Sequence, residues 1–132
     1  MPDHEALSSI LKSEPNGVLF VLFIPTRDKN GKLLSDHSIW LKNAVGLLNK
    51  LFGGATTMPP AKGTWRNDET NSIVKEDIVL VHSYAKNEHV GDEWMMQELA
   101  NFLHGMGRET RQGEIGIVVK DVFHRIRKFQ TT

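Results

Sequence analysis

The sequence predicts an α+β fold, a ferredoxin-like βαββαβ unit with a short N-terminal helix in front of it. A run without polar side chains, residues 18–24, predicts a first strand that is buried on both faces. Two segments repeat apolar residues at i, i+4, i+7, i+8 and i+11, which predicts two amphipathic helices. Right-handed crossovers would place both helices on one face of a four-stranded antiparallel sheet.

The chain divides into three parts. Residues 1–16 form a helical arm that carries Leu7, Ile10 and Leu11 on one face. Residues 17–126 form the single α+β domain, whose first strand is bounded by Gly17 and Pro25. Residues 127–132 are basic and are expected to be frayed.

The two long helices have clear start and stop signals. Ser35 or Asp36 caps the first helix, and Gly53 and Gly54 end it. Asp92 caps the second helix, and Gly105 and Gly107 end it. The predicted core residues of the two helices are Trp40, Ala44, Leu47, Leu48 and Leu51, and Met95, Leu99, Phe102, Leu103 and Met106.

Three further strands complete the predicted sheet. They cover residues 64–67, 74–84 and 115–123, and residues 87–91 form a loop. The alternative is a hairpin folded at Asn30-Gly31, but Leu33-Leu34 is too short a mate for the first strand. The stretch GGATTMPPAKGTW, residues 53–65, matches no phosphate-binding motif, and we interpret it as a structural connection from a helix end to an edge strand.

Composition excludes several function classes. Sixteen basic residues balance sixteen acidic ones, so nucleic acid is not expected as a partner. The chain has no cysteine, which excludes disulfides, thiolate metal sites and cysteine nucleophiles and fits a reducing compartment. No secretory signal or membrane-length apolar run occurs. We therefore expect a soluble, cytoplasmic protein that binds no membrane, metal or cofactor.

Three of the four strands are apolar on both sides, although two helices can cover only one face of the sheet. A bare apolar face of several hundred square ångströms is rare on a monomer. We expect a second copy to cover it, which gives a homodimer that associates through the open sheet face. The alternative cover is the N-terminal arm folded across the sheet.

The candidate site lies on the predicted hairpin of the second and third strands. With a turn at residues 69–72, Trp65 would lie opposite Glu76, on the face that also carries His82 and Tyr84. Glu76 beside an indole is expected to have a raised pKa, so Glu76 and His82 are the candidate catalytic residues. The candidate binding residues are Trp65, Tyr84, Lys62 and Arg66. The alternative is that these residues only pack or are solvated.

From Gly54 to Val118, the runs GATT, KGTWR, IVKEDIVLV and RQGEIGIVV resemble a family of small uncharacterised bacterial proteins. Its members have a Gly-x-Trp hairpin, a glutamate at the start of the next strand and a glutamine before the last strand. The resemblance singles out Gly63, Trp65, Glu76 and Gln112. It implies the same fold and no particular activity.

Two functions fit these observations. The first is a homo-oligomeric α+β domain that binds a small ligand or a protein partner without catalysis. The second is a cofactor-free enzyme on a dimeric scaffold, in which Glu76 or His82 moves a proton on a small organic substrate. The second function rests on fold-level analogy, because such scaffolds host many activities.

Overall fold

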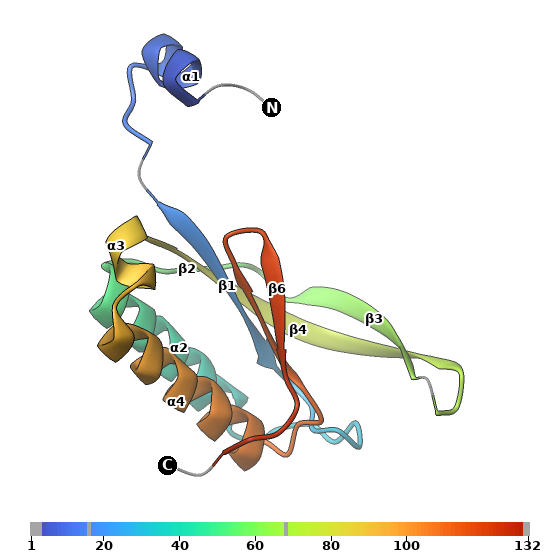
Figure 1. Cartoon of the computed structure of the whole chain (residues 1–132). Coiled ribbons are helices and arrows are strands. Elements are labelled where there is room, and N and C mark those ends of the chain that lie inside the picture. The colour runs from blue at the N-terminus through green and yellow to red at the C-terminus, as the bar shows by residue number, and fades with distance from the viewer. Residues whose placement is uncertain (1–3, 16, 68, 131–132) are drawn as a thin grey trace.

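The computed structural model describes residues 4–15, 17–67 and 69–130, with the side chains of His4 and Asn67 left aside. These residues form an α+β structure whose single antiparallel sheet carries helices on one face (Figure 1). The helices are α1 (His4–Leu11), α2 (His37–Phe52), α3 (Asn87–Val90) and α4 (Glu93–Glu109). The strands are β1 (Val18–Pro25), β2 (Thr56–Thr57), β3 (Ala61–Asn67), β4 (Ser72–Ala85), β5 (Ile115–Val119) and β6 (Val122–Ile126).

The sheet is built around β1, which pairs with β4 on one side and with β5 on the other. Both β2 and β3 pair with the outer edge of β4, and β6 pairs with the outer edge of β5. The first strand therefore has the two neighbours that the crossover argument predicts. The sheet contains six strands in the described residues, however, and not the four that were expected.

The two strands beyond the expected four, β2 and β6, arise from local breaks in the chain. The expected strand 115–123 is a hairpin, because the chain reverses at Lys120 and Asp121, where Lys120 has a φ of 63°. The edge strand is longer than the expected 64–67 and is split into β2 and β3 by Pro59 and Pro60, which have no N–H to donate. Met58 still donates its backbone N–H to Leu80 at 2.9 Å, so the edge stays attached across the break.

The helix boundaries are predicted in part. Gly53 ends α2 with a φ of 87°, and the Asp92 side chain caps α4 by accepting from the Met95 N–H at 3.0 Å. The expected stop at Gly105 and Gly107 is wrong, because α4 continues to Glu109. Residues 87–90, which were expected to be loop, form the short helix α3.

The C-terminal segment 127–130 was expected to be frayed and instead lies against α4. The Gln130 N–H donates to Nδ1 of His104 at 3.0 Å, and Nη1 of Arg108 donates to the Gln130 carbonyl at 2.7 Å. The Phe129 ring occupies the space where a side chain at Gly107 would stand. Gly107 thus serves as a docking position for the tail and not as a helix stop.

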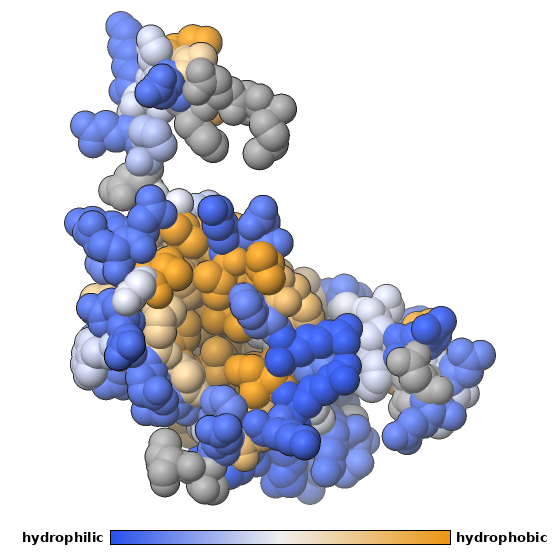
Figure 2. Space-filling view, viewed as in Figure 1, coloured by the Kyte–Doolittle hydropathy of each residue, from blue (hydrophilic) through white to orange (hydrophobic). Residues whose placement is uncertain are grey.

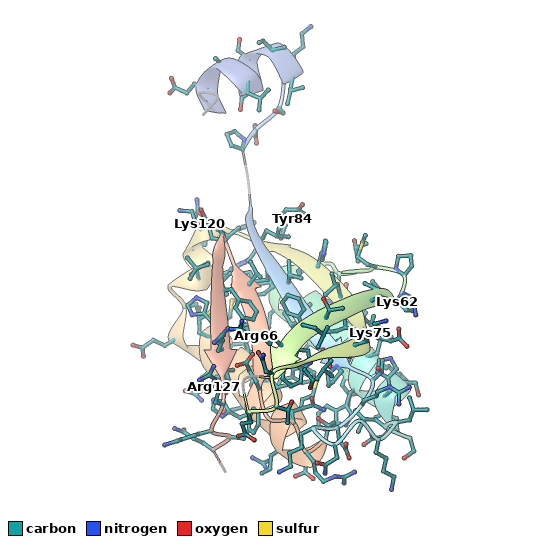
Figure 3. All side chains as sticks on the ribbon, turned by 90° about the vertical axis from the view of Figure 1, so that its right-hand side faces the viewer. Lys62, Arg66, Lys75, Tyr84, Lys120 and Arg127 are labelled. Atoms are coloured by element: carbon teal, nitrogen blue, oxygen red, sulfur yellow. The ribbon has the colours of Figure 1, made fainter. Side chains whose placement is uncertain are left out.

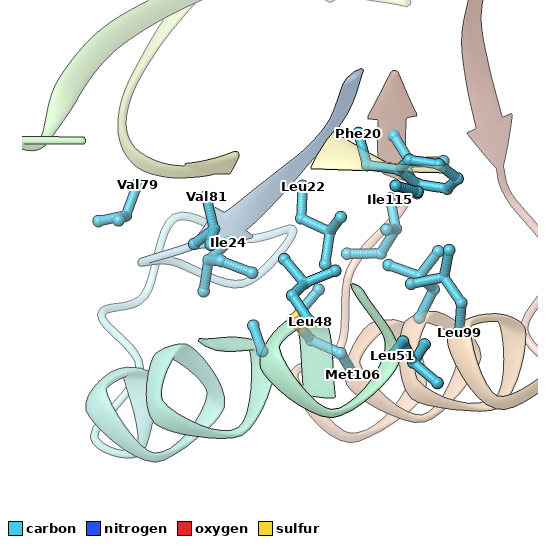
Figure 4. Packing of buried hydrophobic residues seen from close by; sticks show 14 of the residues in the cluster. Phe20, Leu22, Ile24, Leu48, Leu51, Val79, Val81, Leu99, Met106 and Ile115 are labelled. Carbon is cyan, nitrogen blue, oxygen red and sulfur yellow. The ribbon is translucent and has the colours of Figure 1, made fainter. Parts of the chain in front are cut away.

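The core lies between the sheet and the α2–α4 layer (Figure 4). In β1 the even-numbered side chains face the helices, and Phe20, Leu22 and Ile24 are completely buried. On the other face of the sheet, Val21 is buried, whereas Leu19 and Phe23 remain half-buried. The predicted apolar character of both faces is therefore present, and the second face stays open in the single chain.

The N-terminal helix α1 stands clear of the domain beyond the end of β1 (Figure 1). Its apolar side chains Leu7, Ile10 and Leu11 are exposed by 39%, 79% and 61%. The arm does not lie across the open sheet face, so the alternative cover for that face is not observed. No helix among the described residues is both long and apolar enough to span a bilayer.

Leu48→Ala tests the assignment of the core. Leu48 is completely buried between α2 and the sheet, so we expect the substitution to lower the free energy of unfolding by about 2–5 kcal/mol. Ile39→Ala is the matched control on the same helix, because Ile39 is 59% exposed and should change stability by roughly 0.5 kcal/mol or less. Urea unfolding curves of the two variants measure the difference, and equal losses would contradict the assignment.

Candidate functional site

The candidate site depends on the two roles of the long strand β4. Its C-terminal half lies in the sheet, where residues 78–85 pair with β1. Its N-terminal half pairs only with β3, and the resulting hairpin projects from the body of the domain (Figures 1 and 3). The β3–β4 hairpin therefore projects beside the open sheet face.

The observed hairpin register differs from the predicted one by two residues. Trp65 lies opposite Val74, and Glu76 lies opposite Gly63. The shift arises at the turn, where Asn67 already pairs with Ser72 and Asn71 adopts a φ of 57°. Because side chains alternate with a period of two, this shift leaves Trp65 and Glu76 on the same face as diagonal neighbours.

The six candidate residues divide between the two faces of the sheet and its hairpin. Trp65, Glu76, His82 and Tyr84 share the face that continues onto the open side of the sheet. Lys62 and Arg66 lie on the opposite face of the hairpin, and the Lys62 Nζ pairs with Asp77 at 3.3 Å. The structure thus separates the basic candidates from the Trp65–Glu76 pair.

On the face that carries Trp65, Glu76 is an acidic residue whose carboxyl pKa is shifted by its surroundings. Its side chain is half-buried, and this burial raises the pKa of the Glu76 carboxyl above its ordinary value of 4.5. Gly63, the cross-strand partner of Glu76, has no side chain, and a Cβ at this position would lie 3.9 Å from Cγ of Glu76. Trp65 is 48% exposed, so a flat ligand can reach its indole face.

Glu76 and His82 do not form one catalytic pair within a chain. They lie six residues apart on one strand, which separates them by about 20 Å. His82 pairs opposite Val21 and Thr56 in the middle of the sheet, and Tyr84 is 66% exposed at its end. Glu76 and His82 are therefore too far apart to share one proton transfer within a single chain, and each remains a separate candidate.

A recess of about 540 Å³ lies at the base of the hairpin. It is lined by Arg27 and Gly31 from the loop after β1 and by Lys62, Thr64 and Lys75 from the hairpin. Figure 3 shows Lys62 and Lys75 along this side of the hairpin. Glu76 and Asp77 also line the recess, so it carries three basic and two acidic side chains.

The loop that forms one wall of this recess is held by side chains. The Asp28 carboxylate accepts from the N–H groups of Asn30 at 2.8 Å and Lys32 at 3.0 Å. The hydrogen bond from Lys32 is the main cause that lowers the pKa of Asp28. Gln112 donates from Nε2 to the Arg27 carbonyl at 2.8 Å. Sequence reasoning found the Asn30-Gly31 turn but missed Asp28, for which the Asp-x-Asn-Gly spacing was an available signal.

The candidate site has no metal-binding character in the part of the chain that the structure describes. No group of three or more histidine, aspartate or glutamate side chains comes together there. The chemistry available is that of one perturbed carboxyl, an accessible indole and nearby cations.

Comparisons with known proteins relate the chain to solved structures alone. No protein family model and no curated protein sequence matches it. A phage SAM lyase in complex with S-methyl-5'-thioadenosine resembles it with a TM-score of 0.61 and 10% identity, over 87% of this chain and 92% of the other. A phage SAM lyase in the apo state resembles it with a TM-score of 0.55 and 12% identity, over 89% and 94%. At these identities the likeness shows a shared fold.

Glu76→Gln tests the environment of the carboxyl through stability. Because the folded-state pKa is raised, ionisation of Glu76 costs folding free energy as pH rises through that pKa. We expect the variant to be more stable than the parent at pH 7, with the difference vanishing below about pH 4. Denaturant unfolding at several pH values measures this, and Glu93→Gln, at an exposed position of α4, is the control. A variant less stable than the parent at pH 7 would contradict the raised pKa.

Proposed function

We propose that this chain is a homo-oligomeric small-molecule enzyme in which Glu76 acts as the acid–base group. The observation that supports this most is the half-buried Glu76 carboxyl with its raised pKa, on the open face beside the accessible Trp65 indole. A carboxyl poised nearer neutral pH is suited to proton transfer. The fold shared with an enzyme, the phage SAM lyase, favours this function over non-catalytic binding.

The proposed substrate class is an adenosyl sulfonium such as SAM. Its purine can stack on the Trp65 indole, and its positive sulfur is attracted both by the indole face and by an ionised Glu76. One fold neighbour holds S-methyl-5'-thioadenosine, which is an adenosyl thioether of this chemistry.

The proposed reaction is a lyase step that needs no cofactor. The Glu76 carboxylate removes a proton from the carbon next to the one that is bonded to sulfur. The electrons of that C–H bond form a carbon–carbon double bond, and the carbon–sulfur bond breaks with its electron pair on sulfur. The sulfonium becomes a neutral thioether, and the proton on Glu76 returns to solvent.

We also infer that the chain contains a ferredoxin-like unit and that it forms a homodimer through the open sheet face. The unit formed by β1, α2, β3, β4, α4 and β5 is ferredoxin-like, with β2 and β6 as additions at its edges. Its open face carries half-buried Leu19 and Phe23, and the Phe123 ring meets Phe23 edge-on at 5.8 Å. A second copy placed on this face would exclude water from it and would close the site beside Trp65. The reducing compartment expected for a cysteine-free chain is the cytoplasm.

The function is tested by incubating the full chain with SAM and measuring S-methyl-5'-thioadenosine by chromatography. We expect turnover, and we expect Glu76→Gln to lower kcat by about 10²–10⁴-fold, because an amide cannot accept the proton. Glu93→Gln is the matched control and should retain activity. His82→Gln should also retain activity, since His82 lies far from Glu76 along β4.

The outcomes separate the two functions. Binding of SAM or S-methyl-5'-thioadenosine in calorimetry without turnover would support the non-catalytic ligand-binding domain and exclude the enzyme. Absence of both binding and turnover would reject the substrate class. Where binding occurs, Trp65→Ala should weaken it by roughly tenfold or more, which corresponds to about 1–3 kcal/mol for a lost base stack.

Phe123→Lys tests the open face as the interface between copies. Phe123 is 48% exposed on this face, so a lysine there should be tolerated by a monomer and should disrupt an apolar contact between copies. We expect sedimentation velocity to show an oligomer for the parent and a shift toward monomer for the variant. A parent chain that stays monomeric at micromolar concentration would reject the interface.

A further inference from the structure

The structure leaves two apolar surfaces without partners at the same end of the molecule. One is the face of α1 that carries Leu7, Ile10 and Leu11. The other is a hollow of about 400 Å³ beside the first residue of β1, on the helix side of the sheet. We call it the terminal hollow, and its apolar lining is Val18, Val90, Val119 and Val122.

The terminal hollow exists because the helix layer is narrower than the sheet. α2 packs on β1 and β4 and α4 packs on β5, while the turn between β5 and β6 extends beyond the two helices (Figure 1). Val122 is consequently 53% exposed and Val90 36% exposed, although both face apolar neighbours. Figure 2 shows this apolar patch on the side turned to the viewer, below α1 and ringed by polar residues.

We propose that α1 binds in the terminal hollow of a second copy of the chain, in a reciprocal exchange of arms. The three apolar side chains of α1 are spaced at i, i+3 and i+4, which is the pattern of a helix that lies in a groove. A two-fold exchange buries two helix faces and two hollows at once. This interface is separate from the proposed site and does not depend on its activity.

The direction of the arm favours exchange over folding back. α1 stands beyond the end of β1, clear of the β5–β6 hairpin that lines its own hollow (Figure 1). Residues 12–17 connect the two elements and can span about 20 Å when extended, which is enough to reach a neighbouring molecule. Gly17 fixes the exit, since its φ is 148° and a Cβ there would lie 3.3 Å from the Tyr84 Cβ.

The charges of the arm and the hollow are complementary. Residues 4–14 carry two acidic side chains, Glu5 and Glu14, and one basic side chain, Lys12, so their formal charge is −1. The rim of the terminal hollow contributes Lys120 and His124 and no acidic side chain among the residues that line it. The arm with its formal charge of −1 would therefore meet Lys120 at the rim of an apolar hollow, which is a favourable pairing of charges.

Engineered cysteines test the exchange directly, because the chain has none of its own. Full-length Ile10→Cys and Val122→Cys proteins, one with a size tag, are mixed and oxidised mildly. We expect a mixed disulfide dimer on a non-reducing gel, in at least tenfold excess over a mixture of Ile10→Cys with Ile39→Cys. Ile39 is the control because it is 59% exposed on α2, away from the hollow.

Two results would overturn the exchange of arms. The double variant Ile10→Cys, Val122→Cys would form an internal disulfide in dilute solution if α1 folded onto its own domain, and that result would overturn the exchange. A mixed dimer no more abundant than in the Ile39→Cys control would also overturn it. A second measurement uses Ile10→Asp in the Phe123→Lys background, in which association through the open sheet face is removed. There Ile10→Asp should raise the dissociation constant of self-association at least tenfold, while Ile39→Asp should not. Unchanged melting temperatures would show that the domain itself is intact.

Discussion

The pairing of β1 on both edges is the constraint on which the rest of the structure depends. A strand of eight residues that lies between β4 and β5 satisfies its backbone groups and buries Phe20, Leu22 and Ile24 against α2 and α4. The removal of these side chains from water provides most of the driving force for the helix layer. The same strand also places Leu19 and Phe23 on the other face, where the single chain has no second layer to cover them.

The site follows from the unequal lengths of β1 and β4. β4 has 14 residues and β1 has eight, so β4 continues beyond the sheet and pairs with β3 alone. The N-terminal half of β4 lies outside the core, so its side chains can be partly buried without being enclosed. Glu76 occupies such a position, which explains why its carboxyl is desolvated without being enclosed. The resemblance to phage SAM lyase covers 87% of this chain and shows a shared fold.

Two uncovered apolar surfaces give the proposed assembly its physical basis. The open sheet face and the terminal hollow arise from the same shortage, because two long helices are too few to cover both sides of a six-stranded sheet. The exposed apolar face of α1 adds a third surface that gains free energy when it is removed from water. Self-association is the common way in which a small domain resolves such a shortage.

By itself, the sequence determined the elements that depend on local chemistry. The run 18–24, the two helical repeats, the cap at Asp92 and the stop at Gly53 could all be predicted, because periodicity and capping act within a few residues. The candidate pair Trp65 and Glu76 was also placed on one face, because a register error of two residues leaves the face of each side chain unchanged.

Only the tertiary structure decided the features that depend on distant partners. The hairpin register, the split of the last strand at Lys120 and the docking of Phe129 on Gly107 were not predicted. These features are set by which strands pair and by how much space is left between packed elements, and a local pattern carries no information about either.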